Sequence, residues 1–236
     1  PTLELFNAIG SKSARPVATA DEVISVKTPS ELESALSLDE IKVIVLCPGT
    51  YMCSPLGMFL VTRDITMVGL GQVTFLKDWA HVISVAAGRV HLSNVRVTDK
   101  PQCSPECAAF CVDGPASRLT LSNCVVEESC EVGVLAVGEG SCIIESCHFR
   151  RLGKQAVEVR EMGQVEIRGS TFQQVWQGVS AYAGARRVSM ENVVIDGASN
   201  EGVMATGDLQ NSETQQLGQL HGQSEAAVGA GRSGRL

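Results

Sequence analysis

The sequence predicts an all-β fold, a parallel β-helix in which the chain coils into a solenoid, and three observations predict it. Five nine-residue segments align with one another and start at residues 89, 118, 141, 164 and 187, so that successive starts differ by 29, 23, 23 and 23. Within each segment apolar and polar residues alternate, as in a strand with one buried face. No unit contains a helical pattern. A fixed period of this length indicates stacked units, and units without helices close as coils of strands.

The aligned segments predict which side chains face inward. They read RVHLSNVRV, RLTLSNCVV, SCIIESCHF, QVEIRGSTF and RVSMENVVI. Positions two, four and nine are apolar, with Cys142 as one small member, and we expect them in the core. Position six is a turn former in every copy: Asn94, Asn123, Ser146, Gly169 and Asn192. Such residues favour a sharp bend. Position seven places Cys124 and Cys147 next to this bend, and we expect them to stack in adjacent coils.

A second strand follows each aligned segment, within residues 108–112, 132–136, 155–159, 177–181 and 201–205. Two residues of each strand are predicted to point inward. These pairs are Phe110/Val112, Val134/Ala136, Val157/Val159, Val179/Ala181 and Val203/Ala205. A glycine or a short polar turn then leads into the next unit.

The region before residue 89 predicts a capping helix and the earlier, less regular coils. Thr28 is placed as the N-cap, Pro29 as the first helical residue and Glu31 as the capping-box acid, while Leu32, Ala35 and Leu36 share one face. Such a helix would cover the open end of the apolar column. Strands are predicted within 41–46, 65–68, 73–75 and 82–85. We therefore predict an N-terminal extension (1–22), a β-helix (23–206) and a disordered Gly/Gln/Ser-rich tail (207–236).

Composition excludes some classes of function. The formal net charge is −7, which argues against a general nucleic-acid binder, and no apolar run is long enough to span a bilayer. The nine cysteines, an odd number spread through apolar strands, are predicted to be reduced thiols, which favours the cytoplasm or nucleus. A zinc site at Cys103, Cys107 and Cys111 is the alternative, although its spacing departs from the usual C-x2-C pairs. No cofactor or metal is predicted.

Residues 41–75, IKVIVLCPGTYMCSPLGMFLVTRDITMVGLGQVTF, resemble the opening coils of the right-handed parallel β-helix, or pectin-lyase-like, superfamily. With the downstream units the resemblance covers residues 23–206 and implies a single-stranded right-handed β-helix. The later coils are most similar to the β-helix regions of intracellular F-box proteins and of the Shc SH2-domain-binding protein. This resemblance implies a recognition surface rather than a catalytic cleft, although the superfamily contains both enzymes and non-enzymes.

One outward surface of the second strands is the candidate binding site. The register predicts an outward row of Cys111, Leu135, Glu158, Ser180 and Met204, and beside it a row of Asp113, Val137, Arg160, Tyr182 and Thr206. Glu158, Arg160 and Tyr182 would form a mixed patch near Trp176, with Asp113 further along its row. The two aromatic side chains could anchor a peptide or stack on a sugar. The alternative interpretation is an exposed, weak ion pair with Trp176 covering a loop.

Catalysis is disfavoured because the acid–base groups of polysaccharide-cleaving enzymes do not occur in the required succession. The acidic pairs 39–40 and 127–128 are interpreted as solvated turns, since adjacent strand residues point to opposite faces. The basic pair 150–151 is interpreted as a solubilising edge or as a contact for an acidic partner. We therefore predict a non-catalytic module for protein–protein interaction within a larger intracellular protein, with a carbohydrate-binding or polysaccharide-modifying β-helix as the alternative.

Overall fold

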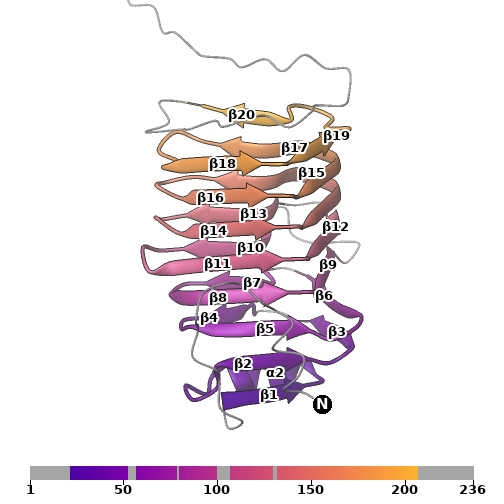
Figure 1. The fold of residues 1–236 in the computed structure, drawn as a ribbon, viewed down its shortest axis with the longest axis vertical. Coiled ribbons are helices and arrows are strands. Elements are labelled where there is room, and N and C mark those ends of the chain that lie inside the picture. The colour runs from indigo at the N-terminus through magenta and orange to yellow at the C-terminus, as the bar shows by residue number, and fades with distance from the viewer. Residues whose placement is uncertain (1–21, 53–56, 79, 100–106, 130–131, 207–236) are drawn as a thin grey trace, which may run out of the picture.

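The computed structural model describes residues 22–52, 57–78, 80–99, 107–129 and 132–206. Its strands stack as successive coils along the long axis of the molecule, all in parallel pairing (Figure 1). From β2 onward each coil contributes one strand to sheet A and one each to two ladders of a second sheet, which we name face B and face C, whereas β1 is followed by a helix. This is the predicted all-β solenoid.

Sheet A contains β1 (Val23–Val26), β2 (Val43–Leu46), β5 (Ile65–Gly69), β8 (Gly88–Ser93), β11 (Ser117–Ser122), β14 (Ser141–Glu145), β16 (Gln164–Arg168) and β18 (Arg187–Glu191). Face B contains β3 (Gly49–Met52), β6 (Val73–Lys77), β9 (Arg96–Asp99), β12 (Val125–Ser129), the first halves of β15 (His148–Val159) and β17 (Thr171–Ala181), and β19 (Val194–Asp196). Face C contains β4 (Phe59–Val61), β7 (Ile83–Val85), β10 (Ala108–Asp113), β13 (Val132–Val137), the second halves of β15 and β17, and β20 (Val203–Ala205).

In the upper coils, residues paired on neighbouring strands of sheet A are 23 positions apart in the sequence. Leu119 pairs with Cys142, Cys142 with Val165, and Val165 with Val188. Positions two, four and nine are buried in the first four aligned segments, as predicted. Because stacked coils repeat the same inward positions, the core is one continuous apolar column.

The second strands point their predicted residues inward as far as the last coil. There the prediction fails: Val203 is half-buried and Ala205 is exposed. Val188 and Met190 of β18 are likewise only partly buried. β18 pairs only with β16, and β20 only with β17, so within the described residues no further coil covers these side chains.

Two columns of left-handed residues lie at the bends of the coils from residue 94 onward. The first, between sheet A and face B, is the predicted position six, where φ is 57° at Asn94, 53° at Asn123, 52° at Ser146, 53° at Gly169 and 53° at Asn192. The second, between faces B and C, was not predicted. It consists of Glu128, Arg151, Gln174 and Gly197.

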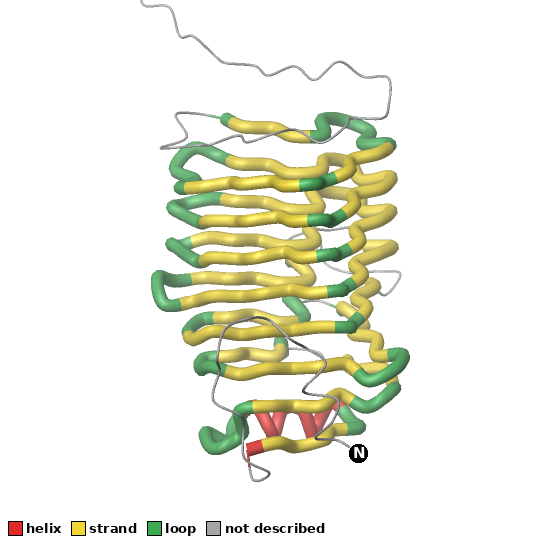
Figure 2. The backbone as a smooth tube through the Cα atoms, viewed as in Figure 1, coloured by secondary structure: helices red, strands yellow, loops and turns green. Residues whose placement is uncertain are grey.

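A short helix, α2 (Pro29–Leu36), lies at the N-terminal end of the solenoid (Figure 2). Thr28 is its N-cap, and the hydroxyl oxygen accepts a hydrogen bond from the Glu31 backbone at 3.2 Å, as predicted. Leu32 and Ala35 are buried at the end of the core. Arg63 donates to the carbonyl of Ala35 at 3.0 Å and thereby joins the helix to a later coil.

Cys124 and Cys147 are buried and stack in adjacent coils as predicted, and each thiol lies near the backbone carbonyl two residues before it. Among the described cysteines, Cys47, Cys111, Cys124, Cys142 and Cys147 are free thiols. The predictions for residues 1–21 and 207–236 lie outside the described residues, as does Cys103 of the alternative zinc site. Among the described residues no group of three His, Cys, Asp or Glu could hold a metal ion.

Candidate interaction surface

The outward row on face C follows the predicted register and extends further toward the N-terminus. From the N-terminal coils upward it consists of Leu60, Ser84, Cys111, Leu135, Glu158, Ser180 and Met204. Leu60 is 52% exposed, and Met58 just before it is 41% exposed. The row therefore begins with accessible apolar side chains and becomes polar in the upper coils.

Glu158, Arg160 and Tyr182 lie together, as the sequence predicts. The Arg160 guanidinium donates through two nitrogens to one carboxylate oxygen of Glu158, and its central carbon lies 5.2 Å from the centre of the Tyr182 ring, within cation–π range. The alternative of an exposed pair is wrong for the acid, because Glu158 is only 2% exposed. Arg160 bridges this buried carboxylate and the aromatic ring.

Two glutamines extend this polar group, and sequence reasoning missed them. The Gln155 side-chain amide donates to the Gln177 carbonyl oxygen and to the Tyr182 hydroxyl, both at 3.1 Å. Ser180 donates to the same Gln177 oxygen at 3.1 Å, and the Gln177 amide donates to Glu201 at 3.4 Å. Gln155 and Gln177 are register partners at the first positions of the second strands 155–159 and 177–181, a position to which the sequence pattern assigned no role.

The remaining two predicted site residues lie at the edge of this polar group. Trp176 precedes Gln177 and is 40% exposed, so it does not bury its ring over a loop. Asp113 is exposed and pairs with Val137, which places it two coils from Arg160 in the same outward row. That separation is roughly 10 Å, so Asp113 does not join the ion pair.

Cys111 carries the one thiol in the outward row. Burial raises its pKa to about 11, with the negative charge of Asp113 as a further cause and a side-chain hydrogen bond to Ser84 opposing the rise. The thiol therefore stays protonated at neutral pH. Since the thiolate is the nucleophilic form of cysteine, this position is unsuited to nucleophilic catalysis.

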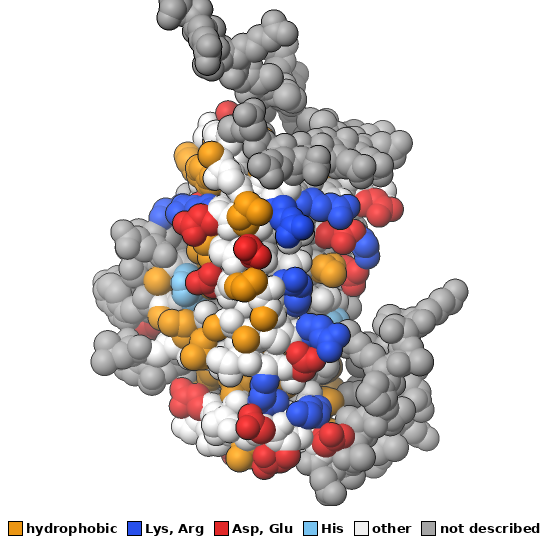
Figure 3. Space-filling view, turned by 90° about the vertical axis from the view of Figure 1, so that its left-hand side faces the viewer, with side chains coloured by type: hydrophobic (Ala, Val, Ile, Leu, Met, Phe, Trp, Pro, Cys, Tyr) orange, Lys and Arg blue, Asp and Glu red, His pale blue; other side chains and the backbone are white. Residues whose placement is uncertain are grey.

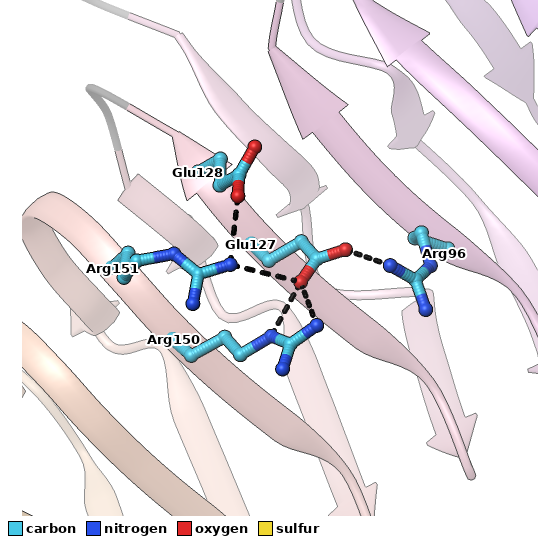
Figure 4. A network of polar contacts seen from close by, with 5 residues as sticks. All are labelled: Arg96, Glu127, Glu128, Arg150 and Arg151. Carbon is cyan, nitrogen blue, oxygen red and sulfur yellow. Dashed lines mark hydrogen bonds and ion pairs between the residues drawn. The ribbon is translucent and has the colours of Figure 1, made fainter.

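A second polar group lies on the outward side of face B (Figure 4). Glu127 is 5% exposed, and its carboxylate accepts hydrogen bonds from Arg96 on one oxygen and Arg150 on the other. Arg151 lies 3.6 Å from the same carboxylate and donates to Glu128 at 2.7 Å. We call these five residues the arginine cluster.

The arginine cluster corrects two interpretations of the sequence. Glu127 is not part of a solvated turn, and Arg150 is not simply a solubilising edge. Adjacent residues reach the same side here because Glu128 and Arg151 have positive φ, which breaks the alternation of the strand. The signal was present in the repeat: Glu127 and Arg150, like Glu128 and Arg151, are opposite charges 23 residues apart.

Sheet A carries charged pairs of a different kind. Arg89 pairs with Asp64 at 2.9 Å, and Arg168 lies between Glu145 and Glu166. All these side chains are at least one-third exposed. Figure 3 views the edge between sheet A and face C, and charged side chains gather on its right half, with hydrophobic ones toward the left. Charge and exposed apolar surface are therefore distributed unevenly around the solenoid.

Comparison with known proteins agrees with this architecture. Residues 108–216 match the family model described as the right handed beta helix region. The match covers less than half of the chain, and together with the parallel coils it shows the right-handed parallel β-helix fold. A search of curated proteins found no match to the chain. Among the described residues no helix is long and apolar enough to cross a membrane.

Proposed function

We propose that this chain is a non-catalytic recognition module that binds a protein partner through the outward surface of face C. The observation that carries the proposal is the polar group at Glu158, where one buried carboxylate holds Arg160 and Tyr182 in place. Arg and Tyr, with Trp, are the side chains most often found as energetic anchors in protein interfaces. Anchors already held by intramolecular contacts lose less conformational entropy on binding.

The apolar end of the same row supports a protein partner. Leu60 and Met58 are exposed on the lower coils, whereas Leu135 and Met204 are half-buried higher on the face. Large exposed apolar side chains beside polar ones are typical of surfaces that bind other proteins. An extended segment of a partner lying along the solenoid axis would contact the exposed Leu60 at one end and Arg160 and Tyr182 at the other.

Three features of the same surface support binding rather than catalysis. The Glu158 carboxylate is occupied by Arg160, Cys111 is protonated at neutral pH, and Asp113 lies two coils away from the ion pair. A role within a larger protein of the cytoplasm or nucleus, like that of the F-box and Shc SH2-domain-binding β-helices, belongs to the same proposal.

Carbohydrate binding is the second candidate, and one observation favours it. Trp176 is 40% exposed at the outer surface of β17. An exposed aromatic ring can stack on the apolar face of a sugar.

Site-specific photo-crosslinking in cells tests the proposal. A photoreactive residue would replace Trp176, and in a matched control it would replace Thr120 on sheet A. We expect one protein to crosslink at residue 176 and not at residue 120, and to bind the purified full chain directly. Replacing Tyr182 or Trp176 by Ala should in each case weaken this binding by about 1–2 kcal/mol, and Trp176→Ala should do so without changing the thermal unfolding temperature.

A glycan array and a polysaccharide turnover assay separate the alternatives. We expect neither glycan binding nor turnover by the full chain, with or without Ca²⁺. Glycan binding that is lost in Trp176→Ala would replace the protein partner by a carbohydrate. Turnover that disappears in Glu158→Gln would overturn the non-catalytic proposal.

A further inference from the structure

The arginine cluster contains more hydrogen-bond donors than its two carboxylates use. A guanidinium carries five N–H donors. Arg96 contacts Glu127 through one nitrogen, Arg150 through two, and Arg151 contacts both acids through a single nitrogen. The three side chains are 42%, 38% and 44% exposed, so their other N–H groups face solvent.

The charge of the cluster is also unbalanced. Three arginines and two glutamates give 3 − 2 = +1, and Glu127, which holds all three guanidinium groups, is itself buried. The local excess of positive charge lies in a chain whose formal net charge is −7. An approaching anion would therefore meet the guanidinium groups rather than the buried carboxylate.

Arg168 on sheet A shows that this arrangement is not a general property of arginines in the solenoid. Its side chain is 47% exposed, much like those of the cluster. It lies between Glu145 and Glu166, however, so that its site has a charge of 1 − 2 = −1. These two acids raise the pKa of Arg168, and an anionic ligand would be repelled there.

We propose that the arginine cluster on face B binds an acidic peptide segment, rich in Asp and Glu, of a protein partner. The buried Glu127 carboxylate acts as a fixed anchor that positions three guanidinium groups toward solvent. Each guanidinium can then form charge-assisted and, where both atoms are free, bidentate hydrogen bonds to a carboxylate. The site is separate from the face C surface and shares with the proposed function only the premise that the partner is a protein.

Fluorescence anisotropy with a short labelled polyglutamate peptide tests the proposal on the full chain. We expect saturable binding that weakens with added salt, as charge-assisted contacts at an exposed site require. The double variant Arg96→Gln/Arg150→Gln should weaken binding at least about tenfold, which corresponds to about 1.4 kcal/mol. Arg168→Gln, the matched control of similar exposure, should leave it unchanged.

A gain of affinity provides the second measurement. Glu128 is 61% exposed and pairs with Arg151, so Glu128→Gln raises the cluster charge from +1 to +2 without removing a buried group. We expect this variant to bind polyglutamate more tightly than the unaltered chain and to unfold at the same temperature. A substitution that acted only by destabilising the fold would not increase the affinity for polyglutamate.

Three results would overturn the proposal. The first is no polyglutamate binding by either the unaltered chain or Glu128→Gln. The second is an equal loss of binding in Arg168→Gln, which would indicate nonspecific attraction. The third is tighter binding of a single-stranded oligonucleotide of equal charge through the same arginines, which would assign the cluster to nucleic acid. Each of these results would leave the face C proposal standing, because the crosslink at residue 176 tests that surface independently.

Discussion

The lower coils, up to residue 99, and the upper coils, from residue 107 onward, share one backbone course but differ in regularity. Sheet A partners in the lower coils are separated by 20 residues at Val23 and Val43, then 23 at Val43 and Thr66, and 25 at Thr66 and His91. After the 29-residue interval from His91 to Thr120, every interval is 23. Turn length therefore varies without altering the parallel stacking of the strands.

The lower and upper coils also differ in the residues that fill the bend between faces B and C. Leu152 and Val175 are register partners there in the upper coils, and both are buried apolar residues. In the lower coils the corresponding column contains Lys77 and Asp99, with an ion-pair distance of 3.6 Å and side-chain exposures of 0% and 2%. Ser129 adds a hydrogen bond of 2.7 Å to the Asp99 carboxylate. The bend between faces B and C is therefore filled by a buried ion pair in the lower coils and by apolar side chains in the upper coils.

The largest expected effect comes from breaking that ion pair. Asp99→Ala leaves the Lys77 ammonium buried without its counter-charge, which typically costs about 3–5 kcal/mol. Urea denaturation of the full chain would measure the free energy of unfolding. Asp64→Ala is the control, because its pair with Arg89 is exposed and should contribute at most about 1 kcal/mol. Equal losses in the two variants would show that the buried pair is not special.

A double replacement sharpens the comparison. Lys77→Leu with Asp99→Leu copies the apolar column of the upper coils, and replacing a buried ion pair by apolar side chains is often neutral or stabilising. We expect the double variant to be more stable than Asp99→Ala by at least about 2 kcal/mol. If it is not, the lower bend requires the charges for a reason other than filling the column.

The next effect concerns the bend that lower and upper coils share. Asn123 has a φ of 53°, and Gly169 occupies the same column with the same φ. Asn123→Ala should cost about 1–2 kcal/mol, because a Cβ residue without a local hydrogen-bonding side chain is disfavoured in this region. Asn123→Gly should be close to neutral. Thermal unfolding of the two variants would test this. An equal loss of stability in both would show that the Asn123 side-chain amide, and not the left-handed backbone conformation, accounts for the effect.

A smaller effect is expected in the cysteine column. Cys147 is followed one coil later by Ser170, a buried residue whose hydroxyl donates to the Arg168 carbonyl at 3.0 Å. The Cys147 thiol lies 3.3 Å from the corresponding carbonyl of Glu145. Cys147→Ser should therefore find a partner and cost less than about 1 kcal/mol. Cys142→Ser should cost about 1–3 kcal/mol, because its thiol bonds only weakly to the Ile143 carbonyl, at 3.9 Å. Urea denaturation would measure both losses. A larger loss of stability in Cys147→Ser than in Cys142→Ser would contradict this explanation.

The smallest effect is a pH dependence in the lower coils. Burial lowers the pKa of His81, and the Ala108 backbone donates to its Nδ1 at 2.9 Å. His81 therefore binds a proton more readily in the unfolded chain than in the folded one. Its full contribution to the free energy of unfolding is present above about pH 6.5, and this contribution is lost as the pH falls from that value toward the lower pKa of the folded state. His81→Gln should flatten the dependence of unfolding free energy on pH in this window. An unchanged slope would assign the titration to another group.

Sequence and structure agree most closely where the repeat is regular. The apolar positions of the aligned segments, the bend at Asn94 and Asn123, and the outward row through Glu158 all follow from local pattern, since side chains of parallel in-register coils repeat at the period of the chain. Prediction failed at Glu127, where positive φ at the next residue cancels strand alternation. It missed the hydrogen bonds of Gln155 and Gln177, because these depend on how the side chains of neighbouring coils pack and not on the alternation of apolar residues.

The sequence by itself determined the solenoid, its period, its inward residues and the residues brought together on face C. It could do so because hydrophobic periodicity and turn chemistry are local and each coil repeats the last. Tertiary structure alone decided which charges are buried, that Glu127 gathers three arginines, and that Lys77 and Asp99 lie inside a bend. Burial depends on the neighbouring coils and on backbone φ at the bends, and neither quantity is carried by the residue types of a single repeat.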